Sequence, residues 1–283
     1  MSTVTITQLP NSGALTGTEV LPIVQSNTTV QTTVQAVANL AGGIIAVGAG
    51  TCSTVRVGNN NTASGACSTI SGGQCNTASG CWSTVAGGRQ NTASGYESTI
   101  AGGQCNSSSG NYSTIGGGFE NIISSCYTST IGGGQNNTAS CGATTIAGGV
   151  QNQAANYRAT VGGGKLNRAS GCQSTIGGGY SNIACNTSST IGGGRQNNIS
   201  ANYAVIVGGF ANTAGGLYSA ILGGKSNNTS TCNAAMIVGS GITANRCNTT
   251  FVNNLSIMSI PTSALGLPTG AVWSELGTLK IVS

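Results

Sequence analysis

A unit of fifteen residues recurs through the middle of the chain, and this short fixed period is the strongest constraint on its fold. The unit reads Ser-Thr-Ile-Gly-Gly-Gly-x-x-Asn-Thr-Ala-Ser-Gly-x-x and keeps its register from Val55 to Ile221, with one 16-residue step between Ile115 and Ile131. Helical repeats need more residues and fewer glycines, whereas a β-solenoid needs only one coil per unit. The branched apolar position includes Ile70, Val85, Ile100, Ile115, Ile131, Ile146, Val161, Ile176 and Ile191. The amide position includes Asn76, Asn91, Asn106, Asn137, Asn152, Asn167, Asn182 and Asn197.

Each unit alternates as two short strands do. In the first strand Ile70 is expected to face inward and Thr69 outward. The glycine run then makes a bend, and the second strand is expected to place Asn76 and Ala78 on one side and Thr77 on the other. The sequence therefore predicts an all-β fold, a parallel β-solenoid of the β-roll or β-helix type with about 12 fifteen-residue coils.

The size of one coil bears on the oligomeric state. Full burial of one Ile or Val contributes about 1.5–3 kcal/mol, while ordering fifteen backbone units costs on the order of 15–30 kcal/mol before hydrogen bonds are counted. We therefore expect a homotrimer in which the Ile/Val ladders of three chains converge on a common axis. A thin monomeric solenoid with an Ile and Ala interior is the alternative.

The composition argues against an enzyme. The chain has 47 glycines, no histidine and no aspartate, and its carboxylate side chains are only Glu19, Glu97, Glu120 and Glu275. Paired-carboxylate catalysis, histidine-based triads and imidazole metal sites therefore lack their residues. We expect a non-enzymatic protein without catalytic, cofactor or metal residues.

The charge pattern argues against nucleic acid and membranes as partners. Nine basic residues against four acidic ones give a net charge of +5, but the basic residues never form a run. The longest mostly apolar stretch, Leu40 to Gly50, is about half a bilayer span, and the first ten residues do not read as a secretory signal. We expect synthesis in a cytoplasm.

Cysteine and tyrosine occupy variable positions of the repeat. The eleven cysteines cannot all pair within one chain, and none forms Cys-x-x-Cys. Cys52 with Cys67, Cys126 with Cys141, and Cys232 with Cys247 are expected to stack on adjacent coils. The sequence leaves three states open for the cysteines: free thiols, some disulfides, or a metal cluster. Seven tyrosines serve either as surface filling or as exposed patches for a glycan.

The repeat unit resembles the head repeats of trimeric autotransporter adhesins of the YadA type. The resemblance covers roughly residues 52 to 250 and implies a trimeric parallel β-roll. The period here is one residue longer than in that family, and no long heptad stalk follows the repeats.

The two ends resemble virion proteins of tailed bacteriophages. Residues 7–10, 14–19 and 21–25 are similar to the N-terminal segment of phage fibre proteins, which that family places next to the virion. Leu9, Pro10, Leu21 and Pro22 are the anchor candidates. Residues 267–282 resemble the closing hairpin of phage structural proteins, with strands expected at 271–274 and 278–282, and we expect this hairpin to cap the solenoid. A short helix is expected at 32–40.

These resemblances imply a structural virion fibre protein, either a tail fibre or a capsid-decorating fibre, exposed on the particle and active in host attachment. Residues 1–45 would form the anchoring module, 46–250 the solenoid and 251–283 the capping hairpin. The partners would be further copies of the chain, other virion proteins, and a host-surface glycan or protein. An ice-binding solenoid that uses the outward threonines and a bacterial surface adhesin head are the alternatives.

Overall fold

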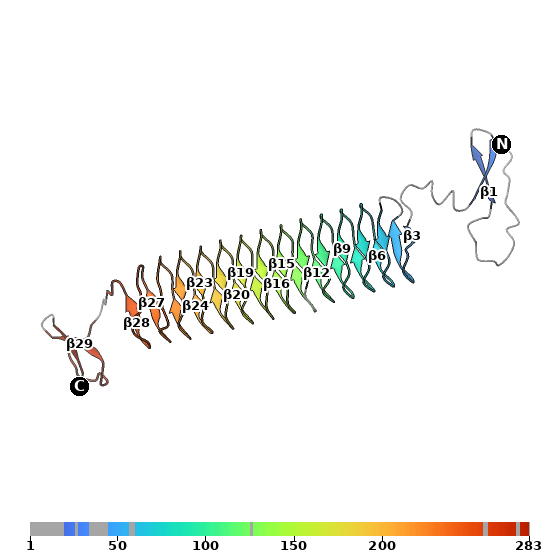
Figure 1. The fold of residues 1–283 in the computed structure, drawn as a ribbon. Helices are drawn as coiled ribbons and strands as arrows, with labels where there is room; N and C mark the ends of the chain where they lie inside the picture. The colour runs from blue at the N-terminus through green and yellow to red at the C-terminus, as the bar shows by residue number, and fades with distance from the viewer. Residues whose placement is uncertain are drawn as a thin grey trace. The chain divides into compact units, whose positions relative to one another are not determined.

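The repeats form the predicted parallel β-solenoid. The computed structural model describes residues 20–25, 28–33, 45–56, 60–124, 127–256, 260–275 and 278–282, and these contain strands and no helix. The solenoid has about 13 turns with a spacing of about 15 residues. The chain divides into two compact units, Met1–Leu166 and Asn167–Ser283. Within each unit the coils stack as successive rungs (Figure 1).

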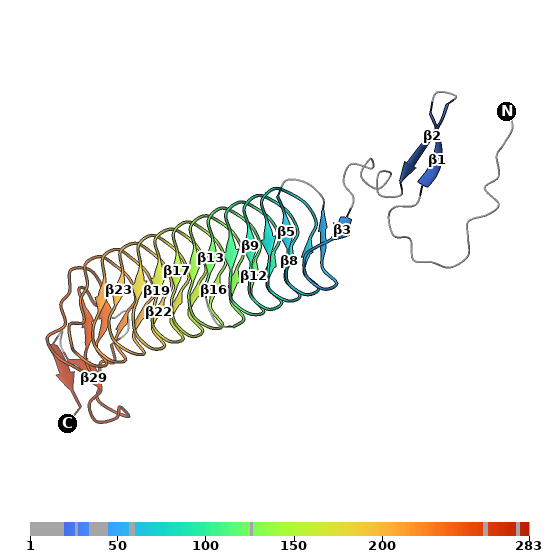
Figure 2. The same ribbon diagram turned by 45° about the vertical axis from the view of Figure 1, so that its right-hand side comes forward.

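Two parallel sheets run through the first unit, one from each strand of the repeat (Figure 2). Equivalent residues pair on successive coils, as Thr99 with Thr114 and Ile100 with Ile115. The first sheet of this unit contains β4 (Thr54–Arg56), β6 (Thr69–Ile70), β8 (Thr84–Val85), β10 (Thr99–Ile100), β12 (Thr114–Ile115), β14 (Thr130–Ile131), β16 (Thr145–Ile146) and β18 (Thr160–Val161). The second sheet contains β5 (Thr62–Ala63), β7 (Thr77–Ala78), β9 (Thr92–Ala93), β11 (Ser107–Ser108), β13 (Ile122–Ile123), β15 (Thr138–Ala139) and β17 (Gln153–Ala154).

The second unit repeats this arrangement. Its first sheet contains β20 (Thr175–Ile176), β22 (Thr190–Ile191), β24 (Val205–Ile206), β26 (Ala220–Ile221), β27 (Met236–Val238) and β28 (Thr250–Val252). Its second sheet contains β19 (Arg168–Ala169), β21 (Ile183–Ala184), β23 (Asn198–Ile199) and β25 (Thr213–Ala214). All pairings in these strands are parallel and in register.

Each antiparallel pair contains at least one strand that lies outside the repeats in sequence. β1 (Val20–Gln25) pairs with β2 (Thr28–Thr33), and β3 (Ile45–Val47) pairs with β4. β29 (Val272–Glu275) pairs with β30 (Thr278–Ile281), which confirms the predicted C-terminal hairpin.

The short helix expected at 32–40 is wrong for residues 32 and 33. Thr32 and Thr33 belong to β2, because the alternating Thr-Thr-Val-Gln-Thr-Thr run pairs as a strand with β1, and residues 34–40 lie outside the described residues. Of the anchor candidates, Leu21 and Pro22 lie in β1, whereas Leu9 and Pro10 lie outside the described residues.

Each coil closes its core within one chain. Ile70 and Ile100 are buried, and so are Ala78 and Ala93, which the second sheet contributes. The premise that the Ile/Val ladder needs neighbouring chains for its burial is therefore wrong. Alanine and asparagine on the opposite sheet take up little space, so the coil is narrow enough for one branched side chain to fill it. The homotrimer itself stays a prediction.

The 16-residue step leaves the register intact. Thr114 pairs with Thr130 and Ile115 with Ile131, while Ile123 pairs with Ala139. The additional residue therefore falls in the segment between β13 and β14, and the pairing of the strands keeps the register of the repeat.

Candidate interaction face

The two predicted ladders lie in the interior. The Ile/Val positions from Ile70 to Ile191 and the Asn positions from Asn76 to Asn197 are all buried, so they serve the fold and do not face a partner. Asn91 shows the pattern. Its Nδ2 donates to the carbonyls of Gly87 (3.0 Å) and Gly103 (2.9 Å), and its Oδ1 accepts from the backbone N–H of Asn106 (3.0 Å). The inward assignment of the asparagines is confirmed.

The described part of the chain shows neither a cluster of metal-ligating side chains nor a membrane-spanning helix. No group of three His, Cys, Asp or Glu side chains placed to hold a metal ion occurs among these residues. None of their elements is a helix of the length and apolarity that a bilayer crossing requires.

All ten described cysteines are free thiols. Burial raises the pKa of the Cys67 thiol, and a hydrogen bond to Cys52 on the preceding coil raises it further. Burial also raises the pKa of the Cys232 thiol, and a hydrogen bond with the Cys247 thiol raises it further. The predicted stacking of these two pairs is confirmed, while Cys126 lies outside the described residues.

The most distinctive surface feature is a row of alternating rings and cations on one bend of the second unit. Tyr180, Arg195, Phe210 and Lys225, here called the cation–aromatic file, occupy the same position on four successive coils and are joined by parallel bridges. The Arg195 guanidinium lies 5.4 Å from the Tyr180 ring centroid and 5.6 Å from that of Phe210. The Lys225 ammonium lies 5.7 Å from the Phe210 centroid. All three distances fall within the range of cation–π attraction.

The file is exposed and carries uncompensated charge. Tyr180 is 39% exposed and Phe210 36%, and both cations are exposed. Residues 167–274 contain four basic side chains and no acidic one. In the described part of this unit the acidic Glu275 forms an ion pair with Lys280. The cations of the file therefore have no carboxylate side chain on their own coils.

The equivalent bend position in the first unit lacks this alternation. Gln74, Arg89 and Gln104 are bridged there on successive coils, so no ring occupies the position equivalent to Arg89 on either neighbouring coil. The file is therefore a local property of the second unit and not a consequence of the repeat.

Other aromatic side chains pair on the opposite bend. Tyr203 stacks on Tyr218 with ring centroids 5.1 Å apart, and Tyr96 meets Tyr112 edge to face at 5.5 Å. A hydrogen bond from the Tyr96 hydroxyl to Glu97, together with partial burial, raises the pKa of Tyr96. These pairs are exposed rings and fit either predicted role of the tyrosines.

The outer face of the first sheet changes character along the second unit. On β24 and the strands that follow, apolar side chains replace the outward Thr and the Gly or Ala of earlier coils, with Val207 54% exposed and Leu222 48%. This apolar patch consists of Val205, Val207, Leu222, Met236, Val238 and Val252. Contiguous exposed apolar surface of this kind marks contact sites on soluble proteins.

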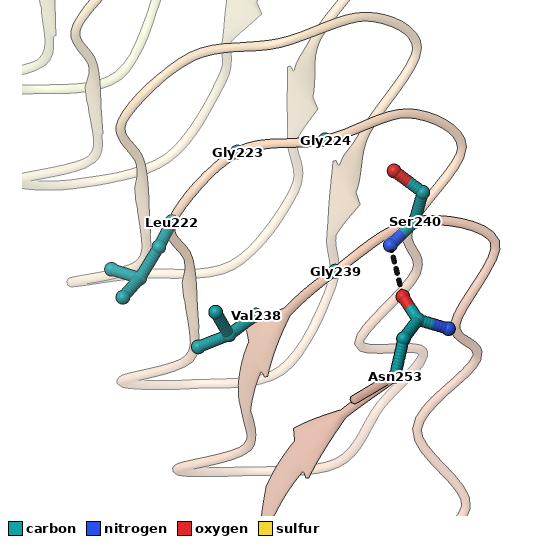
Figure 3. Close-up of a pocket in the computed structure, with 7 residues that line it drawn as sticks. All are labelled: Leu222, Gly223, Gly224, Val238, Gly239, Ser240 and Asn253. Carbon is teal, nitrogen blue, oxygen red and sulfur yellow. Dashed lines mark hydrogen bonds between the residues drawn. The ribbon is translucent and has the colours of Figure 1, made fainter. Parts of the chain in front are cut away.

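A pocket of about 350 Å³ adjoins the patch (Figure 3). Leu222 and Val238 line it together with the bend glycines 223, 224 and 239, and the Ser240 N–H donates to Asn253 Oδ1 at its far side. It holds no charged side chain, so it offers apolar contact and no acid–base chemistry.

The predicted outward threonines form a row on the first sheet. Thr54 Oγ1 donates to Thr69 Oγ1 at 3.2 Å, and Thr84 and Thr99 continue the row. Val205 replaces threonine at this position on β24.

The cation–aromatic file was not predicted from the sequence, because no single residue type marks it. Its signal is the spacing: Tyr180, Arg195, Phe210 and Lys225 lie 15 residues apart and so occupy one repeat position on successive coils. No protein-family model matches this chain, and a search of curated proteins finds no match.

Proposed function

We propose that this protein is a structural, non-enzymatic fibre protein of a bacteriophage particle. The observation that carries the proposal is a solenoid that buries both of its ladders in one chain, with sequences outside the repeats that resemble phage virion proteins. A core of this kind leaves the outer faces of every coil available for contacts. We prefer a phage fibre to the head of a bacterial surface adhesin because both ends of the chain resemble phage virion proteins.

The N-terminal module is proposed to dock on the particle, with the solenoid left for host contact. Deletion of residues 1–45 tests this role. The truncated protein should fold, because each coil contacts only its neighbours, and should fail to join particles produced in a host that lacks the full-length chain. Incorporation at the wild-type level would contradict the docking role, and a chain that keeps residues 1–45 but lacks 278–283 is the matched control.

Self-association is proposed to occur through the apolar patch and not through the Ile/Val ladder. The patch is uncharged, so copies of a chain with net charge +5 can approach there without direct charge repulsion. Light scattering should give three times the 27.6 kDa chain mass. A single species at the chain mass would contradict the trimer.

Ice binding is the second candidate, favoured by the threonine row on a regular parallel sheet. The row offers one threonine per strand. Thermal hysteresis measured on the purified protein separates the two functions, because a virion fibre should show none.

A further inference from the structure

We propose that the cation–aromatic file binds a linear acidic polysaccharide. The inference rests on the proposed function and deepens it, because it assigns host contact to Tyr180, Arg195, Phe210 and Lys225 and names the chemical class of the ligand.

The rings hold the cations in place. Arg195 lies on the coil before Phe210 and Lys225 on the coil after it. The Phe210 ring therefore contacts and restrains both long side chains. Arg195 also contacts Tyr180, which gives the guanidinium a ring on each neighbouring coil. Because the rings order these side chains before binding, a ligand has less conformational entropy to offset. The guanidinium keeps its planar edge for bidentate contact with a carboxylate or sulfate.

The charge of the ligand follows from the surrounding surface. Residues 167–274 contain no acidic side chain, so neither cation is neutralised by a carboxylate of its own coils. Glutamine, alanine and serine follow the file residues at positions 196, 211 and 226. These neighbours add no competing charge, and the exposed Gln196 and Ser226 side chains can hydrogen-bond to sugar hydroxyls.

The spacing of the cations selects among polyanions. Arg195 and Lys225 lie two coils apart, about 9.6 Å at about 4.8 Å per coil. Each strand of a DNA duplex carries one phosphate per about 3.4 Å of helix axis, so most of its phosphates would meet no cation. A polysaccharide with one acidic sugar in each disaccharide spreads its charges more widely. A row of single cations therefore fits it better.

Binding is tested with the purified full-length protein and defined probes. Titration calorimetry with hyaluronan and unsulfated chondroitin oligosaccharides, which carry one carboxylate per disaccharide, should show binding that weakens as salt is raised, with dextran as the neutral probe. The double variant Arg195→Gln, Lys225→Gln should weaken binding at least about tenfold, as expected for the loss of two charge-assisted contacts. Phe210→Leu keeps both charges and should weaken binding several-fold, through loss of the restraint on the two cations.

Arg89→Gln is the matched control, because Arg89 occupies the same bend position between two glutamines. It should leave the affinity within about twofold, and thermal unfolding of all variants should match the wild type. The proposal is overturned if the wild type binds neither acidic probe, if Arg89→Gln weakens binding as much as the double variant, or if an oligo-dT strand or anionic lipid vesicles bind as tightly. Particle incorporation is measured separately, so failure here is distinct from failure of the proposed virion role.

Discussion

Two adjacent glycines in each bend differ in what a methyl group would meet. In the bend after β22, Gly194 has φ +90°, and a Cβ there would collide with the Gly209 carbonyl oxygen of the next coil. Gly193 has no atom within 4 Å of the same hypothetical Cβ. One glycine is therefore required by its left-handed backbone and by coil stacking, while its neighbour is not.

The variants Gly194→Ala and Gly193→Ala should separate these roles. Gly194→Ala should lower the free energy of unfolding by about 3 kcal/mol or more, because it adds left-handed strain to a backbone clash. Gly193→Ala should change it by less than about 1 kcal/mol. Denaturant unfolding followed by circular dichroism measures both, and equal losses would contradict the distinction.

The buried serine that precedes many strands of the first sheet gives a second residue-scale prediction. Ser83 Oγ is buried and has no hydrogen-bond partner, whereas alanine fills the equivalent position at Ala159 and Ala204. Because an unpaired buried hydroxyl is costly, Ser83→Ala should raise the free energy of unfolding by up to about 1 kcal/mol. Ser174→Ala is the control and should destabilise, since Ser174 Oγ donates to the Gly171 carbonyl at 2.7 Å. Destabilisation of both variants to the same extent would show that Ser83 has a partner in solution.

At the scale of the element, the asparagine ladder ties each bend to the next coil. Asn91→Leu should cost about 3 kcal/mol, because it removes both donations to glycine carbonyls and leaves the Asn106 N–H without its acceptor. Asn91→Ser, which keeps a polar group, should cost less. Thermal unfolding at neutral pH measures the series, and a Leu variant more stable than the Ser variant would contradict the role of the ladder.

Asn91→Asp keeps the shape and replaces the donor by a carboxylate that faces two carbonyls. Burial beside those oxygens should raise the pKa of the new carboxyl in the folded state. A group with a raised folded pKa loses stability as the pH rises through that value, so the deficit against wild type should be largest at neutral pH and shrink on acidification. A deficit independent of pH would mean that the carboxyl is solvated.

The sequence predicted the elements well because each coil repeats the same local chemistry. Ile70 and Asn76 recur at fixed positions, and in a parallel stack a fixed position means the same burial on every coil. Two expectations failed for physical reasons. The helix expected at 32–40 failed at residues 32 and 33 because they pair with β1, a contact that the local pattern does not show. The core shared among three chains was unnecessary because small Ala and Asn side chains make each coil narrow enough to fill its own interior. The cation–aromatic file arises from a variable position, where the consensus residues of the repeat do not specify the side chain.

At the scale of the whole molecule, the apolar patch is the surface most suited to joining copies. Leu222→Ser together with Val207→Ser should reduce the scattering mass from three chains to one, because these are the most exposed side chains of the patch. The control pair Ala86→Ser with Ala101→Ser alters the equivalent position on β8 and β10 coils, and should leave the mass unchanged. A trimer that survives the first pair and not the second would place the interface on the earlier coils.

The segment between β13 and β14, which holds one additional residue, has a genetic consequence. Since Ile115 still pairs with Ile131, an insertion in this segment should alter the pairing of the coils on neither side of it. Short foreign peptides inserted there should therefore leave the repeats in register. Whole coils are likewise interchangeable units, so unequal recombination between repeats would lengthen or shorten the gene product in steps of one rung while the remaining side chains keep their neighbours.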